Sequence, residues 1–208
     1  MIFTRSHTDF TTRLMINNKN IEQLSAVRLL GVWISNDLSW QLNCEQLCKK
    51  AYSRLSLLTK LKYVGTKRED LLDIYKLCIR STLEYCSVLF HSSLTKEQSD
   101  MIERCQKVSL QVILSSEYIS YLNALSACSF STLRYRGEQR VLNFCHKAIK
   151  HPYHRRMFPL SDTYTKQIHG MRSYEKYKVN FSRTSAYQNS FIPFAQQKLN
   201  QEFRNLNK

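Results

Sequence analysis

The stretch LCKKAYSRLSLLTKL, residues 47–61, decides the class of fold. Its apolar residues recur every three or four positions, the period of an α-helix with one buried face: Leu47, Ala51, Leu55, Leu58 and Leu61. Lys49, Ser53 and Lys60 fall on the opposite face, and Arg54 lies at the edge of the apolar stripe. The spacing therefore predicts an amphipathic helix with a basic outer face.

The residues that follow predict a second helix. Gly65 should end the first helix, and Thr66 with Glu69 has the spacing of a capping box for the next. Residues 71–90 are apolar nearly all round, which is typical of a buried central helix, and His91-Ser92-Ser93 should end it.

Three more helices are expected before residue 152. Thr95 with Gln98 forms another capping box, a short helix is predicted over 118–127, and a longer one from residue 131 or 132 to residue 150. Pro152 should stop that last helix, because proline lacks the amide hydrogen that helix continuation needs.

Toward the N-terminus the pattern changes to short apolar runs, which predict strands: Met1–Thr4, Arg13–Ile16, Ile21–Leu24 and Arg28–Ile34. Asn17 to Asn20 should form a hairpin turn, since Asn tolerates positive φ. Three good N-cap residues precede the first helix: Asn36, Asp37 and Ser39.

Residues 151–190 lose all periodicity and mix basic side chains with five tyrosines. They predict an extended arm that is ordered only if something docks it, followed by a short helix over Phe191–Leu206. The predicted fold is mainly α: short N-terminal β-hairpins lead into a helical bundle, with a basic irregular C-terminal arm. We place the N-terminal hairpins at residues 1–37, the helical bundle at 38–150 and the C-terminal arm at 151–208.

The charge favours a polyanionic partner such as RNA. The net charge is +15, and it is concentrated in two stretches: residues 41–68 hold seven basic and one acidic residue, and residues 131–208 hold 15 and four. The sequence has no run long enough to span a membrane and no secretory signal at Met1. We therefore expect an intracellular protein, in the cytoplasm or nucleus, with no membrane partner.

The motif order is similar to the C-terminal part of non-LTR (LINE, jockey- or CR1-like) retrotransposon reverse transcriptases. The motifs that carry the resemblance are LLGVWISNDLSW at 29–40, RSTLEYCSVLFHSSLT at 80–95, ERCQK at 103–107 and YQNSFIP at 187–193. Phe90 stands where that family usually has Trp, and Asn180 stands in place of a usual Pro. The resemblance covers essentially the whole chain.

This resemblance implies a thumb and post-thumb module that follows the end of a palm domain at residues 1–37. It implies sequence-tolerant binding of RNA or an RNA–DNA duplex, with possible packing on palm and fingers domains absent from this sequence. The primer-grip-like hairpin would contribute Leu30, Gly31, Val32 and Trp33. Phosphate contacts are expected from two sets of basic residues, in the first helix and in the arm: Lys49, Lys50, Arg54, Lys60, Lys67, Arg68, Arg172, Lys176, Lys178 and Arg183.

We expect no catalytic residue, metal or cofactor, and no small-molecule substrate. The family's catalytic Asp-Asp pair is missing, and two-metal phosphoryl transfer requires clustered carboxylates. Cys145 with His151 and His154 offers too few ligands for structural zinc. The seven Cys residues are expected to be free thiols.

Two alternatives stay open. The first is an inert or interaction-only remnant of a mobile element. The second is an AlkB-type 2-oxoglutarate-dependent dioxygenase or a domain associated with a tRNA methyltransferase. It is implied by a similarity of the chain to the small N-terminal region of an AlkB-homologue tRNA-modifying enzyme. His7 and Asp9 have the spacing of an iron-binding pair, but the predicted strands are too few for the β-scaffold that such a site needs.

Overall fold

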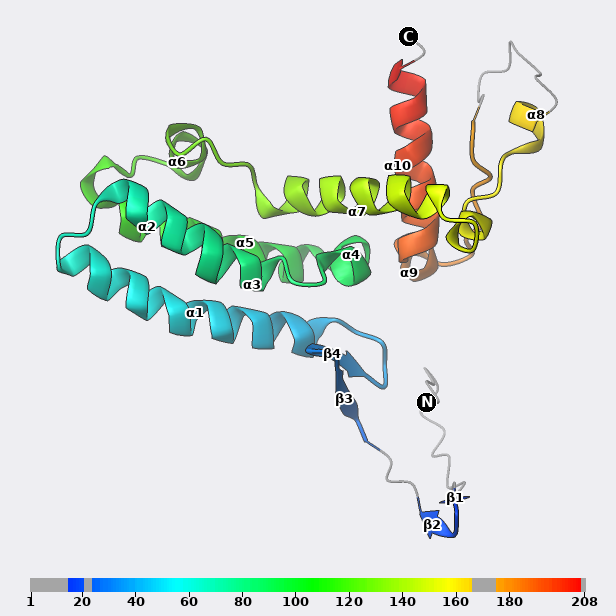
Figure 1. Ribbon diagram of the computed structural model, residues 1–208, viewed down its shortest axis with the longest axis horizontal. Helices are drawn as coiled ribbons and strands as arrows, with labels where there is room; N and C mark the ends of the chain where they lie inside the picture. The colour runs from blue at the N-terminus through cyan, green and yellow to red at the C-terminus, as the bar shows by residue number, and fades with distance from the viewer. Residues whose placement is uncertain (1–14, 21–23, 166–174, 207–208) are drawn as a thin grey trace.

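The computed structural model describes residues 15–20, 24–165 and 175–206. It is mainly helical, with short antiparallel hairpins before the helices, as the sequence predicts. The helix α1 lies on one side of a layer formed by α2, α3 and α5, and α7 lies on the other (Figure 1). The strand predicted over Met1–Thr4 and nearly all of that over Ile21–Leu24 fall outside the described residues.

The first hairpin pairs β1 (Met15–Ile16) with β2 (Lys19–Asn20). Asn17 and Asn18 both have positive φ, +49° and +59°, as a two-residue hairpin turn that follows the strand twist requires. The prediction of a turn at this point is confirmed.

The second hairpin corrects a prediction. Instead of one strand over Arg28–Ile34, the chain forms β3 (Ala26–Leu29) and β4 (Val32–Ser35), paired antiparallel. It turns back at Leu30 and Gly31, whose φ values are +47° and +87°. The sequence did not predict this turn, because the run around it is apolar and Gly31 is its one typical turn residue.

Helix α1 spans Gln41–Tyr63, but none of the three predicted caps occupies its N-cap position. Trp40 is the N-cap residue and makes no side-chain cap hydrogen bond. Asp37 instead accepts a hydrogen bond from the Ser39 amide at 2.9 Å, which closes the turn before the helix.

The C-terminus of α1 is where the sequence places it. The Gly65 amide donates to the Lys62 carbonyl and the Thr66 amide to the Leu61 carbonyl, both at 3.1 Å. This pair of bonds is a Schellman motif, and the φ of +88° at Gly65 is the conformation that favours glycine there.

The second helical segment consists of α2 (Arg68–Ile74), a π-helical turn η1 (Tyr75–Arg80) and α3 (Ser81–Leu83). Its N-cap is Lys67, so the predicted capping box at Thr66 does not form. The segment ends where Cys86 adopts a φ of +52°, before the predicted break.

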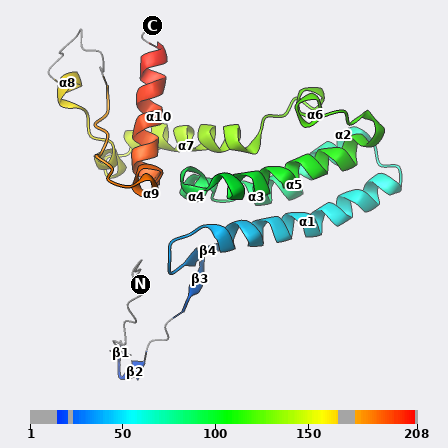
Figure 2. The same cartoon turned by 180° about the vertical axis from the view of Figure 1, so that it is seen from behind.

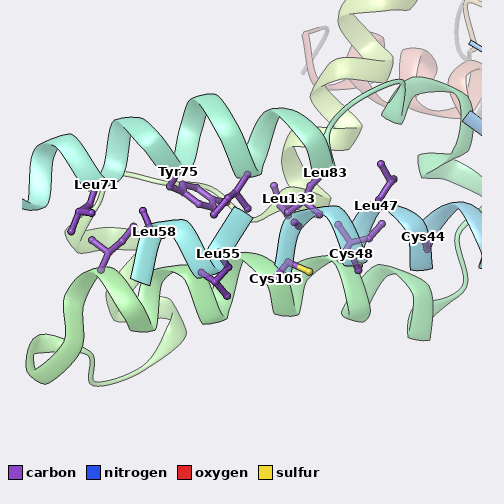
Figure 3. Close-up of a cluster of buried hydrophobic side chains, with 14 of the residues drawn as sticks. Cys44, Leu47, Cys48, Leu55, Leu58, Leu71, Tyr75, Leu83, Cys105 and Leu133 are labelled. Atoms are coloured by element: carbon purple, nitrogen blue, oxygen red, sulfur yellow. The ribbon is translucent and has the colours of Figure 1, made fainter. Parts of the chain in front are cut away.

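This segment is buried on one face only, which corrects the prediction of an all-round buried helix. Leu71, Tyr75, Ile79 and Leu83 are fully covered, whereas the side chain of Leu77 is 75% exposed. Together with the apolar face of α1 and with Ile102 and Ile113 of α5, they form the main core between the three elements (Figure 3). The same core also contains Cys44, Cys48, Cys105 and Leu133 (Figure 3).

Two short helices, α4 (Ser87–Phe90) and η2 (His91–Ser93), lead to α5 (Lys96–Leu114). Both bonds of the predicted capping box at the start of α5 are present: the Gln98 amide donates to Thr95 Oγ1, and the Thr95 amide to Gln98 Oε1. This local prediction is confirmed.

The turn η3 (Ser115–Glu117) precedes α6 (Tyr121–Ala127), which is three residues shorter than predicted. Helix α7 (Leu133–Lys150) begins after Thr132, whose hydroxyl accepts a hydrogen bond from the Tyr135 amide. Its start and its end before Pro152 agree with the sequence.

The described part of the C-terminal arm forms a second small core. After η4 (His154–Met157) and α8 (Asp162–Thr165), the chain continues through α9 (Ser185–Gln188) into α10 (Phe191–Leu206), which crosses α7 in both views (Figures 1 and 2). Phe158 and Tyr177 are buried there with residues of α7 and α10.

The arm is docked by its own chain, through buried amides of α10. Asn200 Oδ1 accepts from the Tyr177 amide and Asn200 Nδ2 donates to the Tyr177 carbonyl, both at 2.8 Å. Gln196 accepts from the Asn180 amide at 3.2 Å and donates to the Met157 carbonyl at 3.1 Å. These side chains form hydrogen bonds with the amides and carbonyls of the extended backbone, as a neighbouring strand would.

The two cores meet where His91 packs against Gly137. A Cβ at Gly137 would overlap Nδ1 and Cε1 of the His91 ring, so glycine allows this close approach. The same ring lies edge-on to Phe194 of α10, with centroids 6.4 Å apart. Burial lowers the pKa of His91 from its ordinary value of 6.5.

Candidate nucleic-acid interface

The outer face of α1 carries exposed lysines. Lys49 and Lys60 are exposed there, Lys50 is half-buried, and Lys67 is exposed just before α2. Within the described residues, no carboxylate forms an ion pair with any of these four. Their charges are therefore available to an external anion.

Two arginines predicted to contact phosphate make hydrogen bonds within the chain. Arg54 Nη1 donates to the Cys78 carbonyl at 2.6 Å and to the Thr82 hydroxyl, which ties α1 to the second helical segment. Arg68 pairs with Glu117 at 2.9 Å and also donates to the Ala127 carbonyl. The structure thus assigns both side chains to helix packing first.

The hairpin tip is fixed to the helices by two hydrogen bonds. The Tyr85 hydroxyl donates to the Leu30 carbonyl at 2.8 Å, and the Trp33 amide donates to Asn43 Oδ1 at 3.2 Å. Val32 is buried and Trp33 half-buried, whereas the Leu30 side chain is 84% exposed. Of the four predicted hairpin contacts, Leu30 is the most accessible. The Gly31 backbone passes close to the Tyr85 ring.

The predicted arm residues divide in a similar way. Lys176 Nζ lies 5.6 to 5.7 Å from the ring centroids of Tyr164, Tyr177 and Phe203, so its charge is held in an aromatic cage within the chain. Lys178 and Arg183 are exposed. Arg172 lies outside the described residues.

Glu84, in the LEY motif, is a packing residue. Its carboxylate is only 6% exposed and faces α7, where Arg136 binds it through both Nε and Nη2 and Arg140 Nη2 binds it at 2.6 Å. Leaving this carboxylate unpaired would be costly, so the three side chains fix α7 over α3.

Glu103 and Gln106, in the ERCQK motif, build a second polar network. Glu103 accepts hydrogen bonds from the Leu133 and Arg134 amides, at 3.1 and 3.2 Å, so it caps the N-terminus of α7 from a different helix. Gln106 is fully buried; its Oε1 accepts from the Tyr75 hydroxyl at 2.6 Å, and its Nε2 donates to the Tyr121 hydroxyl at 2.8 Å.

These structural roles went unnoticed in the sequence. The available signal was the acidic residue Glu84 between apolar neighbours in a segment predicted to be buried, which is unusual unless the charge is paired. Its partners Arg136 and Arg140 are 52 and 56 positions away, and no local pattern joins them.

All seven Cys residues are free thiols, as expected. Burial raises the pKa of Cys44 and of Cys145 to about 12, which keeps both protonated and unreactive. Across the described ranges, no three His, Cys, Asp or Glu side chains lie close enough to hold a metal ion. His7 and Asp9 lie outside those ranges.

No helix in the described part of the chain combines the length and the apolar character needed to cross a bilayer. In comparisons with known proteins, no family model, no curated protein and no solved structure matches this chain.

Proposed function

We propose that this chain binds the phosphate backbone of RNA or an RNA–DNA duplex through the lysines of α1, without reading base sequence and without catalysis. The observation that carries the proposal is the row formed by the exposed Lys49 and Lys60 on α1, with Lys67 exposed just before α2; none of the three has a carboxylate partner in the described chain. The net charge of +15 supports the same partner.

The geometry of the row suits a duplex. Lys49 and Lys60 are separated by eleven positions on one straight helix, about 16 Å along its axis. At about 3.4 Å per base step, that separation corresponds to about five steps of a duplex strand. Contacts of this kind position a duplex but carry no sequence information.

The sequence resemblance to non-LTR reverse transcriptases supports this reading, as it implies a thumb module. In such an element, the backbone at Leu30 and Gly31 would lie against the primer end. Because Arg54 and Arg68 make hydrogen bonds within the chain, we base the proposal on the lysines.

The test is fluorescence-anisotropy binding of the full chain to a labelled RNA–DNA hybrid, across a salt titration. Replacing Lys49, Lys60 and Lys67 together by Gln should weaken binding. Since each phosphate contact on a duplex contributes about 0.9 to the slope of log K against log salt, the slope should flatten by about 2.7.

A charge-matched control carries Gln at exposed lysines of other elements, Lys19, Lys96 and Lys107. The control should keep most of the wild-type slope. Equal slopes for the wild type, the α1 variant and the control would contradict the assignment of the interface to α1.

A second candidate function is packing against a separate protein domain, as an interaction-only remnant. It is favoured by exposed apolar side chains: Leu29 and Leu30 at the hairpin tip, Leu77 in η1 and Leu89 in α4. A chain that circular dichroism shows to be helical, yet that fails to bind the hybrid at low salt, would favour this candidate.

A further inference from the structure

The last turn of α7 and the residues after it form a strongly basic short stretch. Residues 147–156 hold four Lys or Arg and two His with no acidic residue. All six of these side chains are exposed: Lys147, Lys150, His151, His154, Arg155 and Arg156. We call residues 147–156 the basic turn.

The basic turn is anchored to the second core. The Arg155 amide donates to the His151 carbonyl at 2.9 Å and the Phe158 amide to the Arg155 carbonyl at 3.0 Å. The Phe158 side chain is buried, and Gln196 of α10 holds the Met157 carbonyl. The cations are thus presented by a fixed turn, which lowers the entropy lost when a ligand binds.

The positive charge of the basic turn is not neutralised within the described chain. The carboxylates of α7 and α10 pair with side chains outside the basic turn: Glu202 with His146 at 2.9 Å and Glu138 with Lys198 at 2.7 Å. The C-terminal dipole of α7 favours Lys147 and Lys150, but this effect falls off within the last helical turn. It does not account for Arg155 and Arg156.

An aromatic surface lies among these cations. The Tyr153 side chain is 69% exposed, and its ring meets the His154 ring at 83° with centroids 5.4 Å apart. The His154 ring lies 4.8 Å from that of His151. An exposed ring supported from one side and flanked by cations is the arrangement on which unpaired bases stack.

We propose that the basic turn is a second nucleic-acid site, which takes a single strand. Tyr153 stacks on an unpaired base, while Arg155 and Arg156 bind the flanking phosphates. The inference rests on the proposed function only in that the partner is a nucleic acid. The two sites lie on α1 and just after the C-terminal end of α7, helices on opposite sides of the central layer (Figure 1).

The experiment compares two labelled probes, oligouridylate RNA and a blunt RNA–DNA hybrid, by anisotropy with the full chain. Tyr153→Ala should weaken oligouridylate binding about 5- to 150-fold, since stacking on one aromatic side chain stabilises by about 1–3 kcal/mol per base. Tyr153→Phe should retain most of the binding. Hybrid binding should stay at the wild-type level in both variants.

Two further variants sharpen the comparison. Arg155→Gln with Arg156→Gln should flatten the salt slope for oligouridylate by about 1.4, at about 0.7 per contact on a single strand. Tyr135→Ala, which removes an exposed tyrosine near the start of α7, is the matched control and should bind oligouridylate like the wild type.

The outcomes separate the two proposals. Wild-type oligouridylate binding by the Tyr153 and Arg155/Arg156 variants would overturn the second site and leave the α1 interface standing. If the wild-type chain binds oligouridylate but does not bind the hybrid, the α1 interface is overturned and the basic turn is left standing. If the variants lose binding to phosphatidylserine vesicles while RNA binding is unchanged, the basic turn is a membrane contact and the proposal is wrong.

Discussion

Replacing Glu103 by Gln tests whether a remote carboxylate holds α7 in place. Glu103 accepts from the first two amides of α7, at 3.1 and 3.2 Å, while Thr132 accepts from the third at Tyr135. Gln keeps the size of the side chain but removes the charge and one of the two accepting oxygens. Because the Tyr121 hydroxyl also donates to Glu103 Oε1, the change weakens that contact together with the cap.

The expected loss follows from these contacts. Each hydrogen bond to a charged group contributes about 1.5–3 kcal/mol, and a carboxylate at a helix N-terminus gains about 0.3–1 kcal/mol from the dipole. Since Glu103 is half-buried and Gln retains one acceptor, we expect the free energy of unfolding to fall by about 2–4 kcal/mol.

Urea unfolding followed by circular dichroism measures this loss. With a slope of about 3 kcal/mol per molar urea, the midpoint should fall by about 1 M. Thr132→Ala, which removes only the local cap, should lose about 1 kcal/mol. A smaller loss for Glu103→Gln than for Thr132→Ala would refute the remote cap.

Three further predictions concern the same helix contacts. Glu84→Gln should lower the free energy of unfolding by about 1.5–3 kcal/mol in urea titrations, because the partly exposed Arg136 and Arg140 lose a charged hydrogen-bond acceptor. Gly137→Ala should lose about 1–3 kcal/mol in the same assay, because the new Cβ overlaps the His91 ring; a gain in stability would contradict that contact. Burial lowers the pKa of His91 below 6.5, so the unfolded chain takes up the proton first. Stability should therefore fall as the pH drops below about 6.5, and His91→Leu should flatten that part of a stability-versus-pH profile.

Several features set by neighbouring residues were predictable from the sequence, although the capping box at Thr66 was not among them. The capping box at Thr95, the cap at Thr132, the helix end at Gly65 and the bounds Phe191–Leu206 all agree with the structure. Each depends on hydrogen bonds or apolar spacings that span about three to five positions, which a linear sequence displays directly.

The candidate site was only partly predictable for the same reason. The basic outer face of α1 follows from helical spacing, and Lys49 and Lys60 are exposed as expected. The sequence did not show that Arg54 and Arg68 make hydrogen bonds within the chain. Their partners, which include Cys78, lie 24 to 60 positions away.

The sequence by itself determined a helical chain, where most of its helices begin and end, and where positive charge gathers. Only the tertiary structure decided which charges stay free, that Glu84 and Glu103 lock α7, and that Asn200 docks the arm. The reason is physical: a charge or amide is satisfied by whatever the fold brings within about 3 Å, and that neighbour is chosen by packing of the whole chain.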